Sequence, residues 1–252
     1  MSVIPINRKG LAEGRDNDSK TTGMLSAHLD ERDIHCDKSR IHWVAPIGFT
    51  TSTTAMGHYM ALSLAGGTGT VSLVNTSGGF VRLYCSAASG SFMGIGRSGA
   101  CIRSDAPSLE VAFRVESLGG QRFHFELYKD SDEYITVRVA SGGAVEYVCN
   151  DKSGAASGAW APQDDGLNDL PSVLTVAKDT WYRMTLGVND SGKPFLINHG
   201  SDGSRDVYTL KATDSAMVIT TGLHYPQAKV YSTAGGVAVA NIKAWDEGID
   251  KL

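Results

Sequence analysis

Long apolar runs are missing from this chain of 252 residues. No stretch approaches the roughly 18 consecutive apolar residues of a membrane-spanning helix, so no membrane span is expected. The first 20 residues also lack the apolar core of a secretory signal peptide. We therefore expect the chain to be made in a cytoplasm, without a signal peptide.

Cysteine is scarce and widely spaced. The four cysteines lie 49, 16 and 48 residues apart, and none belongs to a C-x-x-C pair. This pattern does not form the disulfide framework of a small secreted domain. We expect reduced thiols that are buried as small apolar side chains, namely Cys36, Cys85, Cys101 and Cys149.

An excess of positive charge is also missing. The chain carries 23 Lys and Arg against 27 Asp and Glu, which gives a net charge of −4 and an isoelectric point near 6.0. The basic residues are scattered rather than gathered into a stripe. Nucleic acid and anionic membranes are therefore excluded as general partners.

Glycine and period-two alternation are abundant. The 29 glycines exceed the roughly 18 that average usage predicts. Apolar residues alternate with polar ones in short segments separated by turn residues, and no helical segment lies between them, which excludes a parallel α/β sheet. The expected strands cover 59–64, 70–75, 80–85, 109–116, 123–127, 135–139, 144–149, 207–210, 216–221 and 237–245, the last with a bulge near Asn241.

The hairpin at 179–200 is the clearest unit of the pattern. Met184, Leu186 and Val188 share one face of its first strand, and residues 189–192 have turn chemistry. Phe195 and Ile197 return the apolar face. A hairpin needs further strands and an opposing layer, so the sequence predicts an all-β antiparallel sandwich over residues 46–252.

Residues 1–45 differ from the rest because they are rich in charge and show no sustained period of two. They form either a disordered tail or an extended arm that becomes ordered on a neighbouring subunit. The arm interpretation is favoured by apolar side chains that a solvated tail seldom carries, namely Ile34, Ile41, Trp43 and Val44.

Residues 80–250 resemble the concanavalin-A-like and laminin-G-like jelly rolls. The resemblance depends on the strand LEVAFRVE, the hairpin TWYRMTLGV–turn–PFLIN and the final strand VAVANIKAW. It implies two antiparallel sheets, frequent calcium sites, and glycan or protein binding on loops, while enzymatic members hydrolyse or eliminate polysaccharides. A jelly roll behind a polar arm also resembles structural proteins of tailed-phage virions.

No catalytic residues are expected. Glycoside hydrolysis needs two carboxylates about 5–9.5 Å apart, whereas Glu110 and Glu116 on one strand face lie roughly 20 Å apart. The acidic group around Asp130 and Asp132 fits a hairpin loop better than an acid–base pair. A G-x-S-x-G elbow and the Arg, Gln-His and Tyr-Lys motifs of alginate-lyase-like members are absent. The sequence thus predicts that the chain is not an enzyme.

Binding sites are expected on loops. Calcium prefers several oxygen ligands from a flexible loop, and the best set is Asp164, Asp165, Asn168 and Asp169, with Asp130 and Asp132 second. The alternative is a solvated acidic loop that holds no cofactor. A glycan would stack on an exposed aromatic ring, first Trp160 and then His224 and Tyr225, unless Trp160 instead pins its loop onto the sandwich.

Three functions remain open at this stage. The first is a non-enzymatic virion structural protein (capsid decoration, baseplate or tail fibre), made in the host cytoplasm and assembled with copies of itself and other virion proteins through the arm. The second is a carbohydrate-binding module or adhesin for a host surface glycan. The third is a polysaccharide hydrolase or lyase.

Overall fold

The computed structural model describes residues 41–44, 55–56, 60–66, 69–74, 80–96, 107–163, 170–219, 224–233 and 237–249. All of them belong to one compact unit that begins at Ile41. Apart from the short 3-10 helix η1 (Ala212–Asp214), the regular elements of these residues are strands. No helix in this part of the chain is long and apolar enough to span a membrane.

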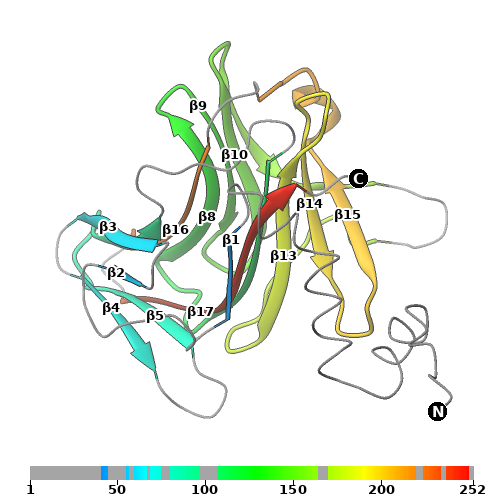
Figure 1. Ribbon diagram of the computed structural model, residues 1–252. Helices are drawn as coiled ribbons and strands as arrows, with labels where there is room; N and C mark the ends of the chain where they lie inside the picture. Colours follow the sequence, from blue (N-terminus) through cyan, green and yellow to red (C-terminus); the bar gives the residue numbers. More distant parts are fainter. Residues whose placement is uncertain are drawn as a thin grey trace, which may run out of the picture. The chain divides into compact units, whose positions relative to one another are not determined.

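The strands form two antiparallel sheets, which we call sheet A and sheet B (Figure 1). Sheet A has the spatial order β12 (Ala161–Pro162), β15 (Arg205–Thr209), β14 (Pro194–His199), β13 (Trp181–Val188), β7 (Pro107–Val115), β17 (Ala238–Ile249), β5 (Phe80–Cys85) and β4 (Gly69–Val74), and β1 (Ile41–Val44) also pairs with β17. Sheet B has the order β11 (Ala155–Ala159), β10 (Val145–Asp151), β9 (Glu133–Val139), β8 (Gln121–Asp130), β16 (Tyr225–Ser232), β6 (Phe92–Gly96), β3 (Met60–Gly66) and β2 (Ala55–Met56).

The core lies between the two sheets and is built by every second side chain of each strand. Leu109, Val111 and Phe113 of β7 are fully buried, as are Phe125 and Leu127 of β8. The Phe113 ring contacts two rings of sheet B, with centroid distances of 4.9 Å to Phe123 and 5.7 Å to Phe125. These contacts join the layers, and each buried aromatic ring contributes roughly 1.5–3 kcal/mol to stability.

The all-β sandwich expected from the sequence is confirmed. The hairpin expected at 179–200 consists of β13 and β14, which pair from Arg183 opposite His199 to Val188 opposite Pro194. The bulge expected near Asn241 lies between Ile242 and Ala244, where the register of β17 against β7 shifts. Cys85 and Cys149 are buried free thiols as expected, while Cys36 and Cys101 lie outside the described residues.

Two expectations about the strands are wrong. The described part of 216–221 is not a strand, because Met217 and Ile219 enter the core from a loop that the backbone bond from Ile219 N–H to the Gly192 carbonyl holds in place. The second is that no strand lies between 144–149 and the hairpin at 179–200, whereas β11 lies there and pairs with β10, from Glu146 opposite Ala159 to Asn150 opposite Ala155.

The end of the predicted arm is part of sheet A. Residues 41–44 form β1, which pairs with β17 from Ile41 opposite Glu247 to Val44 opposite Ala244. Ile41, Trp43 and Val44 are therefore strand residues, whereas Ile34 lies outside the described residues. The backbone groups of β1 find their partners within the chain itself.

Candidate functional site

The outward side of sheet B carries a dense group of polar and aromatic side chains. Because successive side chains of a strand point to opposite faces, the residues between the core positions face away from the other sheet. We call this group the sheet B face, and its members on β8, β9, β10 and β16 are His124, Glu126, Tyr128, Tyr134, Thr136, Arg138, Glu146, Tyr225, Gln227, Lys229 and Tyr231.

The strand register arranges these side chains in rows across the sheet. One row contains Lys229, His124, Arg138 and Glu146 on four adjacent strands. The next row contains Gln227, Glu126 and Thr136, and a third contains Tyr225, Tyr128 and Tyr134. Residues that directly oppose each other have Cβ atoms about 4.5–5.5 Å apart, so each row forms a continuous line of contacts.

Glu126 is the central carboxylate of the face and is only 5% exposed. It accepts a hydrogen bond of 2.9 Å from Thr136 Oγ1 and forms an ion pair with Lys229. The Lys229 ammonium also lies 5.6 Å from the centroid of the Tyr128 ring. The charge of Glu126 is therefore neutralised inside the protein and is not presented to a ligand.

His124 is held in its neutral form. Burial, together with the positive charges of Arg138, Lys229 and Arg122, lowers its pKa to about 3. Its Nε2 atom is buried and has no hydrogen-bond partner among the described residues. A neutral imidazole with an unused ring nitrogen can accept a proton or a hydrogen bond from a ligand.

Tyr231 lies beside His124, with ring centroids 4.6 Å apart. Burial, followed by the negative charge of Glu126, raises the pKa of the Tyr231 phenol, so the hydroxyl keeps its proton. Phe92 contacts the other side of this ring at 5.6 Å between centroids. His124 and Tyr231 are thus a fixed pair of one proton acceptor and one proton donor.

The remaining charges of the face are also paired. Glu146 accepts hydrogen bonds from Nε of Arg138 at 2.8 Å and from its Nη2 at 2.5 Å. The exposed Arg122 lies opposite Tyr231, in the row next to that of His124 and Lys229. Gln227 has a buried Oε1 atom without a hydrogen-bond partner in the described part of the chain.

On sheet A, Glu110 and Glu116 belong to separate networks of ion pairs and hydrogen bonds. Glu110 pairs with Arg183 at 2.6 Å and also accepts a bond from Thr185, which contacts His199 Nε2 at 2.8 Å. Glu116 instead pairs with Arg82 at 2.7 Å. Glu110 and Glu116 therefore form ion pairs with different arginines on the outward side of sheet A.

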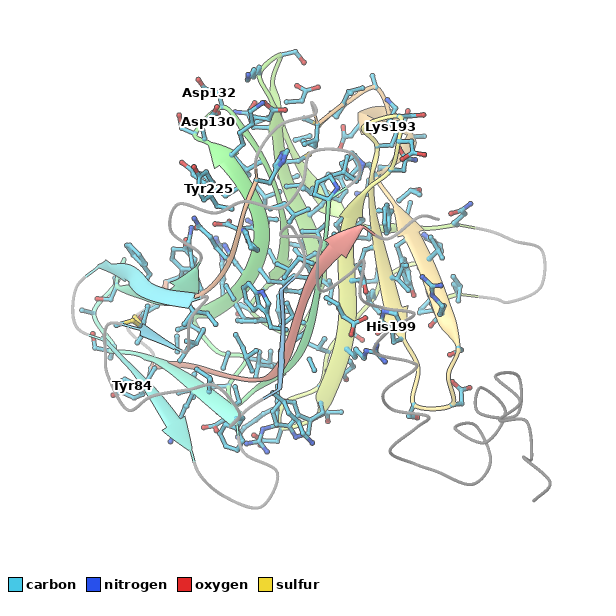
Figure 2. All side chains as sticks on the ribbon, viewed as in Figure 1. Tyr84, Asp130, Asp132, Lys193, His199 and Tyr225 are labelled. Carbon is cyan, nitrogen blue, oxygen red and sulfur yellow. The ribbon has the colours of Figure 1, made fainter. Side chains whose placement is uncertain are left out.

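The predicted glycan-binding residues are not brought together. Trp160 is only 1% exposed and packs edge to face on Tyr147 in the core, with ring centroids 5.5 Å apart. His224 is fully buried. Tyr225 (Figure 2) alone belongs to the sheet B face, and the strand register places it opposite Tyr128.

The predicted calcium ligands Asp164, Asp165, Asn168 and Asp169 lie outside the described residues. Asp130 ends β8 and Asp132 lies in the turn before β9 (Figure 2). Asp130 Oδ1 accepts a bond of 2.9 Å from the Asp132 backbone N–H. Within the described ranges, no group of three His, Cys, Asp or Glu side chains is placed to hold a metal ion.

The sequence contained one signal for the sheet B face, and it lies along a single strand. Tyr225, Gln227, Lys229 and Tyr231 alternate with smaller residues, and this period of two places all four side chains on one face of β16. Pro226 weakens the strand prediction. The structure tolerates it because the pairing of β16 with β6 begins only at Gln227.

Comparison with solved structures identifies the fold as a concanavalin-like jelly roll, while the chain matches no protein-family model and no curated protein in sequence. A protein of unknown function from Shewanella oneidensis MR-1 superposes with a TM-score of 0.57 at 12% identity, over 82% of this chain and 84% of the other. A prokaryotic beta-1,3-1,4-glucanase (lichenase) from a mouse hindgut metagenome gives 0.54 at 8% identity, over 84% and 100%. The transglycosylase Crh5 gives 0.52 at 11% identity, over 84% and 85%.

The prediction that the chain is not an enzyme is contradicted by these neighbours, because a glucanase and a transglycosylase share its fold. The prediction was drawn from carboxylates at alternate positions of single strands. On the sheet B face, His124 and Tyr231 lie on adjacent strands, so spacing along one strand could not show that they lie side by side.

Proposed function

We propose that this protein is a polysaccharide lyase, which cleaves an acidic polysaccharide by β-elimination at the sheet B face. The observation that carries the proposal is the contact between the neutral His124, with its unused Nε2, and the protonated Tyr231. Hydrolysis would need two available carboxylates, whereas Glu126 and Glu146 are each neutralised by a cation.

In β-elimination a base removes the proton from the carbon next to the uronate carboxylate. The bond to the leaving glycosidic oxygen breaks, a carbon–carbon double bond forms, and an acid protonates the oxygen. His124 Nε2 is the base and the Tyr231 hydroxyl is the acid. A bound carboxylate would also raise the pKa of His124 from its value in the free protein, which makes the imidazole a stronger base when substrate is present.

Positive charge supports an acidic substrate. Arg122, Arg138 and Lys229 all lie close enough to lower the pKa of His124. Arg122 is exposed and lies in register with Tyr231, so its guanidinium can hold the substrate carboxylate as negative charge develops on it.

The test is the ultraviolet absorbance of unsaturated product after incubation with polygalacturonate, alginate or hyaluronan, with the neutral glucan lichenan for comparison. His124→Asn and Tyr231→Phe should each lower the rate by about 100-fold or more, because each removes one proton-transfer group. The matched controls His199→Asn and Tyr84→Phe change the same residue types on sheet A and should keep wild-type rates. New reducing ends from lichenan without an unsaturated product would contradict elimination.

Binding without turnover is the second candidate, and the row of tyrosines favours it. Tyr128 and Tyr134 stack with ring centroids 6.4 Å apart, and Tyr225 continues the row on β16. Aromatic rings of this kind offer broad contact area to a sugar chain. A protein whose migration in a gel is slowed by the polymer, and which releases no product, would be a carbohydrate-binding module. In that case Tyr128→Ala should weaken the retardation, while the control Tyr84→Ala should not.

We also propose that the protein is part of a tailed-phage virion, the location expected from the sequence. A polysaccharide-cleaving jelly roll carried by a tailed-phage virion would reach the surface glycan of its host, with residues 1–40 as the assembly arm and calcium held by residues 164–169. The native mass tests the arm: the full chain should form an oligomer and a chain lacking residues 1–40 should not. A monomeric full chain would contradict it.

A further inference from the structure

The outward side of sheet A carries a group of aromatic and basic side chains on four adjacent strands. The strand register places Trp181 of β13 opposite Arg114 of β7. The same row continues with Asn241 of β17 and Arg82 of β5. We call the aromatic and basic members of this group the cationic patch, and they are Phe80, Arg82, Arg114, Trp181 and Lys243.

The bulge in β17 adds Lys243 to the patch. The register of β17 against β7 shifts between Ile242 and Ala244, so Lys243 is the extra residue. Ile242 is fully buried in the core, whereas Lys243 is exposed. A bulge re-aims a side chain, and the Lys243 ammonium lies 5.9 Å from the centroid of the Trp181 ring. The bulge therefore places a positive charge beside an aromatic ring.

The two aromatic rings of the patch hold the Arg114 guanidinium. Phe80 and Trp181 pack edge to face with ring centroids 5.9 Å apart, and Arg114 Cζ lies 5.2 Å from each centroid. Such cation–π contacts are attractive and fix the geometry of the charge. Trp181 is nevertheless 38% exposed. The patch is thus formed in advance, and part of its indole ring is open to a partner.

Positive charge exceeds negative charge in and around the patch. Glu116 lies 2.7 Å from Arg82 Nη2 and 3.6 Å from Arg114 Nη2. Together with Lys243, three described cations therefore share this one carboxylate. The side chains of Arg82 and Arg114 are 40% and 24% exposed, so the surplus charge reaches the surface. A second copy presenting the same patch would be repelled, whereas carboxylates would complement it.

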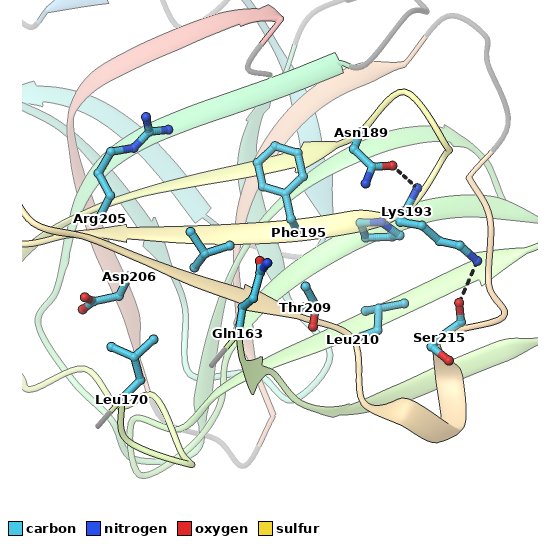
Figure 3. A pocket seen from close by; sticks show the side chains of 12 residues that line it. Gln163, Leu170, Asn189, Lys193, Phe195, Arg205, Asp206, Thr209, Leu210 and Ser215 are labelled. Atoms are coloured by element: carbon cyan, nitrogen blue, oxygen red, sulfur yellow. Dashed lines mark hydrogen bonds between the residues drawn. The ribbon is translucent and has the colours of Figure 1, made fainter. Parts of the chain in front are cut away.

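The patch is separate from the concave part of sheet A. A pocket of about 670 Å³ lies along β14 and β15 (Figure 3), and none of its lining residues belongs to the patch. Small molecules prefer concave sites. Tryptophan and arginine are the residue types that most often dominate protein–protein binding. The composition and position of the patch therefore favour a protein partner over a small ligand.

We propose that the cationic patch is a docking surface for an acidic segment of another protein. An apolar side chain of that segment would cover Trp181, and its carboxylates would pair with Arg82, Arg114 and Lys243 in charge-assisted contacts. The patch and the sheet B face belong to different sheets, so this proposal does not depend on the proposed elimination.

The test is the selection of random peptides on the immobilised full chain, followed by fluorescence anisotropy with the selected peptides. The selected sequences should be enriched in aspartate and glutamate next to an aromatic or aliphatic residue. Trp181→Ala should weaken their binding by about 30-fold, because it removes the central apolar contact.

Lys243→Glu is the second variant, and it reverses a charge at an exposed position. It should weaken binding of the acidic peptides by about tenfold or more, while Lys243→Arg should bind them as the wild type does. Lys211→Glu is the matched control, because it makes the same charge change at an exposed position after β15, outside the patch. It should leave the affinity unchanged.

The proposal is overturned if the selection yields no acidic peptides, or if Trp181→Ala and Lys243→Glu bind them as the wild type does. It is also overturned if polygalacturonate or phosphatidylserine vesicles displace the peptides, which would assign the patch to a glycan or a membrane. A dimer in sedimentation that Trp181→Ala dissociates would overturn it too, because the occupant would then be a second copy.

Discussion

His124 is a side chain whose neutral form the folded protein favours. An unfolded histidine has a pKa near 6.5, whereas burial and neighbouring cations lower the folded value to about 3. Between these values the unfolded chain binds more protons. The free energy of unfolding therefore falls as the pH drops from about 6.5 towards 3, and this contribution is constant above 6.5.

The limiting slope is about 1.4 kcal/mol per pH unit for one such group. Between about pH 7 and pH 5, His124→Asn should therefore lose about 2 kcal/mol less stability than the wild type. Urea unfolding of both proteins at the two pH values measures the difference. An equal loss in both would show that His124 titrates normally in the folded state.

Gly187 is a strand residue at which a side chain has no room. An added methyl group would overlap the Phe195 ring, so Gly187→Ala should destabilise the protein by about 1–3 kcal/mol. Gly154→Ala is the matched control, because nothing lies within 4 Å of a methyl group there. Thermal unfolding should show a lower midpoint for the first variant and an unchanged or slightly higher one for the second.

At the scale of elements, β16 is held to β8 by a buried ion pair. Lys229 contacts Glu126, whose side chain is 7% exposed. Lys229→Met should cost about 3–5 kcal/mol, because it leaves a buried carboxylate without its counter-charge. The double variant Glu126→Gln, Lys229→Met should recover most of the loss. A double variant that is less stable than Lys229→Met, by chemical unfolding, would show that the pair itself supplies the stability.

Strands with a regular alternation were predictable from the sequence because one face of each had to be buried. β5, β7, β8, β9 and β10 all alternate in this way, and their core positions are filled as expected. β16 also alternates, but it was not among the expected strands, since Pro226 near its start weakens the strand prediction. Conversely, residues 216–219 alternate but form a loop, because burial of Met217 and Ile219 does not require sheet hydrogen bonds.

Of the residues on the sheet B face, only Tyr225 was predicted from the sequence as a binding residue. The residues that make it up are far apart in the chain, and only the register of β16 against β8 places Lys229 opposite His124. Long-range register depends on how whole strands pack, which spacing within one strand does not determine. Trp160 follows the alternative that the sequence left open, in which it pins its segment onto the sandwich, because its ring fills the core beside Tyr147.

At the scale of the whole molecule, Phe113 connects the two layers. It is fully buried on sheet A and contacts Phe123 and Phe125 of sheet B. Phe113→Ala should cost about 3–5 kcal/mol in the free energy of unfolding. Phe80→Ala is the control, since Phe80 is half-buried on the outward side of sheet A, and it should cost clearly less. Equal losses in denaturant titrations would show that the interlayer contact adds nothing.

The sheet B face extends over four adjacent strands, from Lys229 on β16 to Glu146 on β10. A long glycan bound there as proposed would lie across these strands with its two ends beyond them. Cleavage would then fall within the polymer rather than at its ends. The viscosity of a solution of long glycan should therefore drop before much unsaturated product has accumulated, an order that a viscometer and an absorbance reading record together.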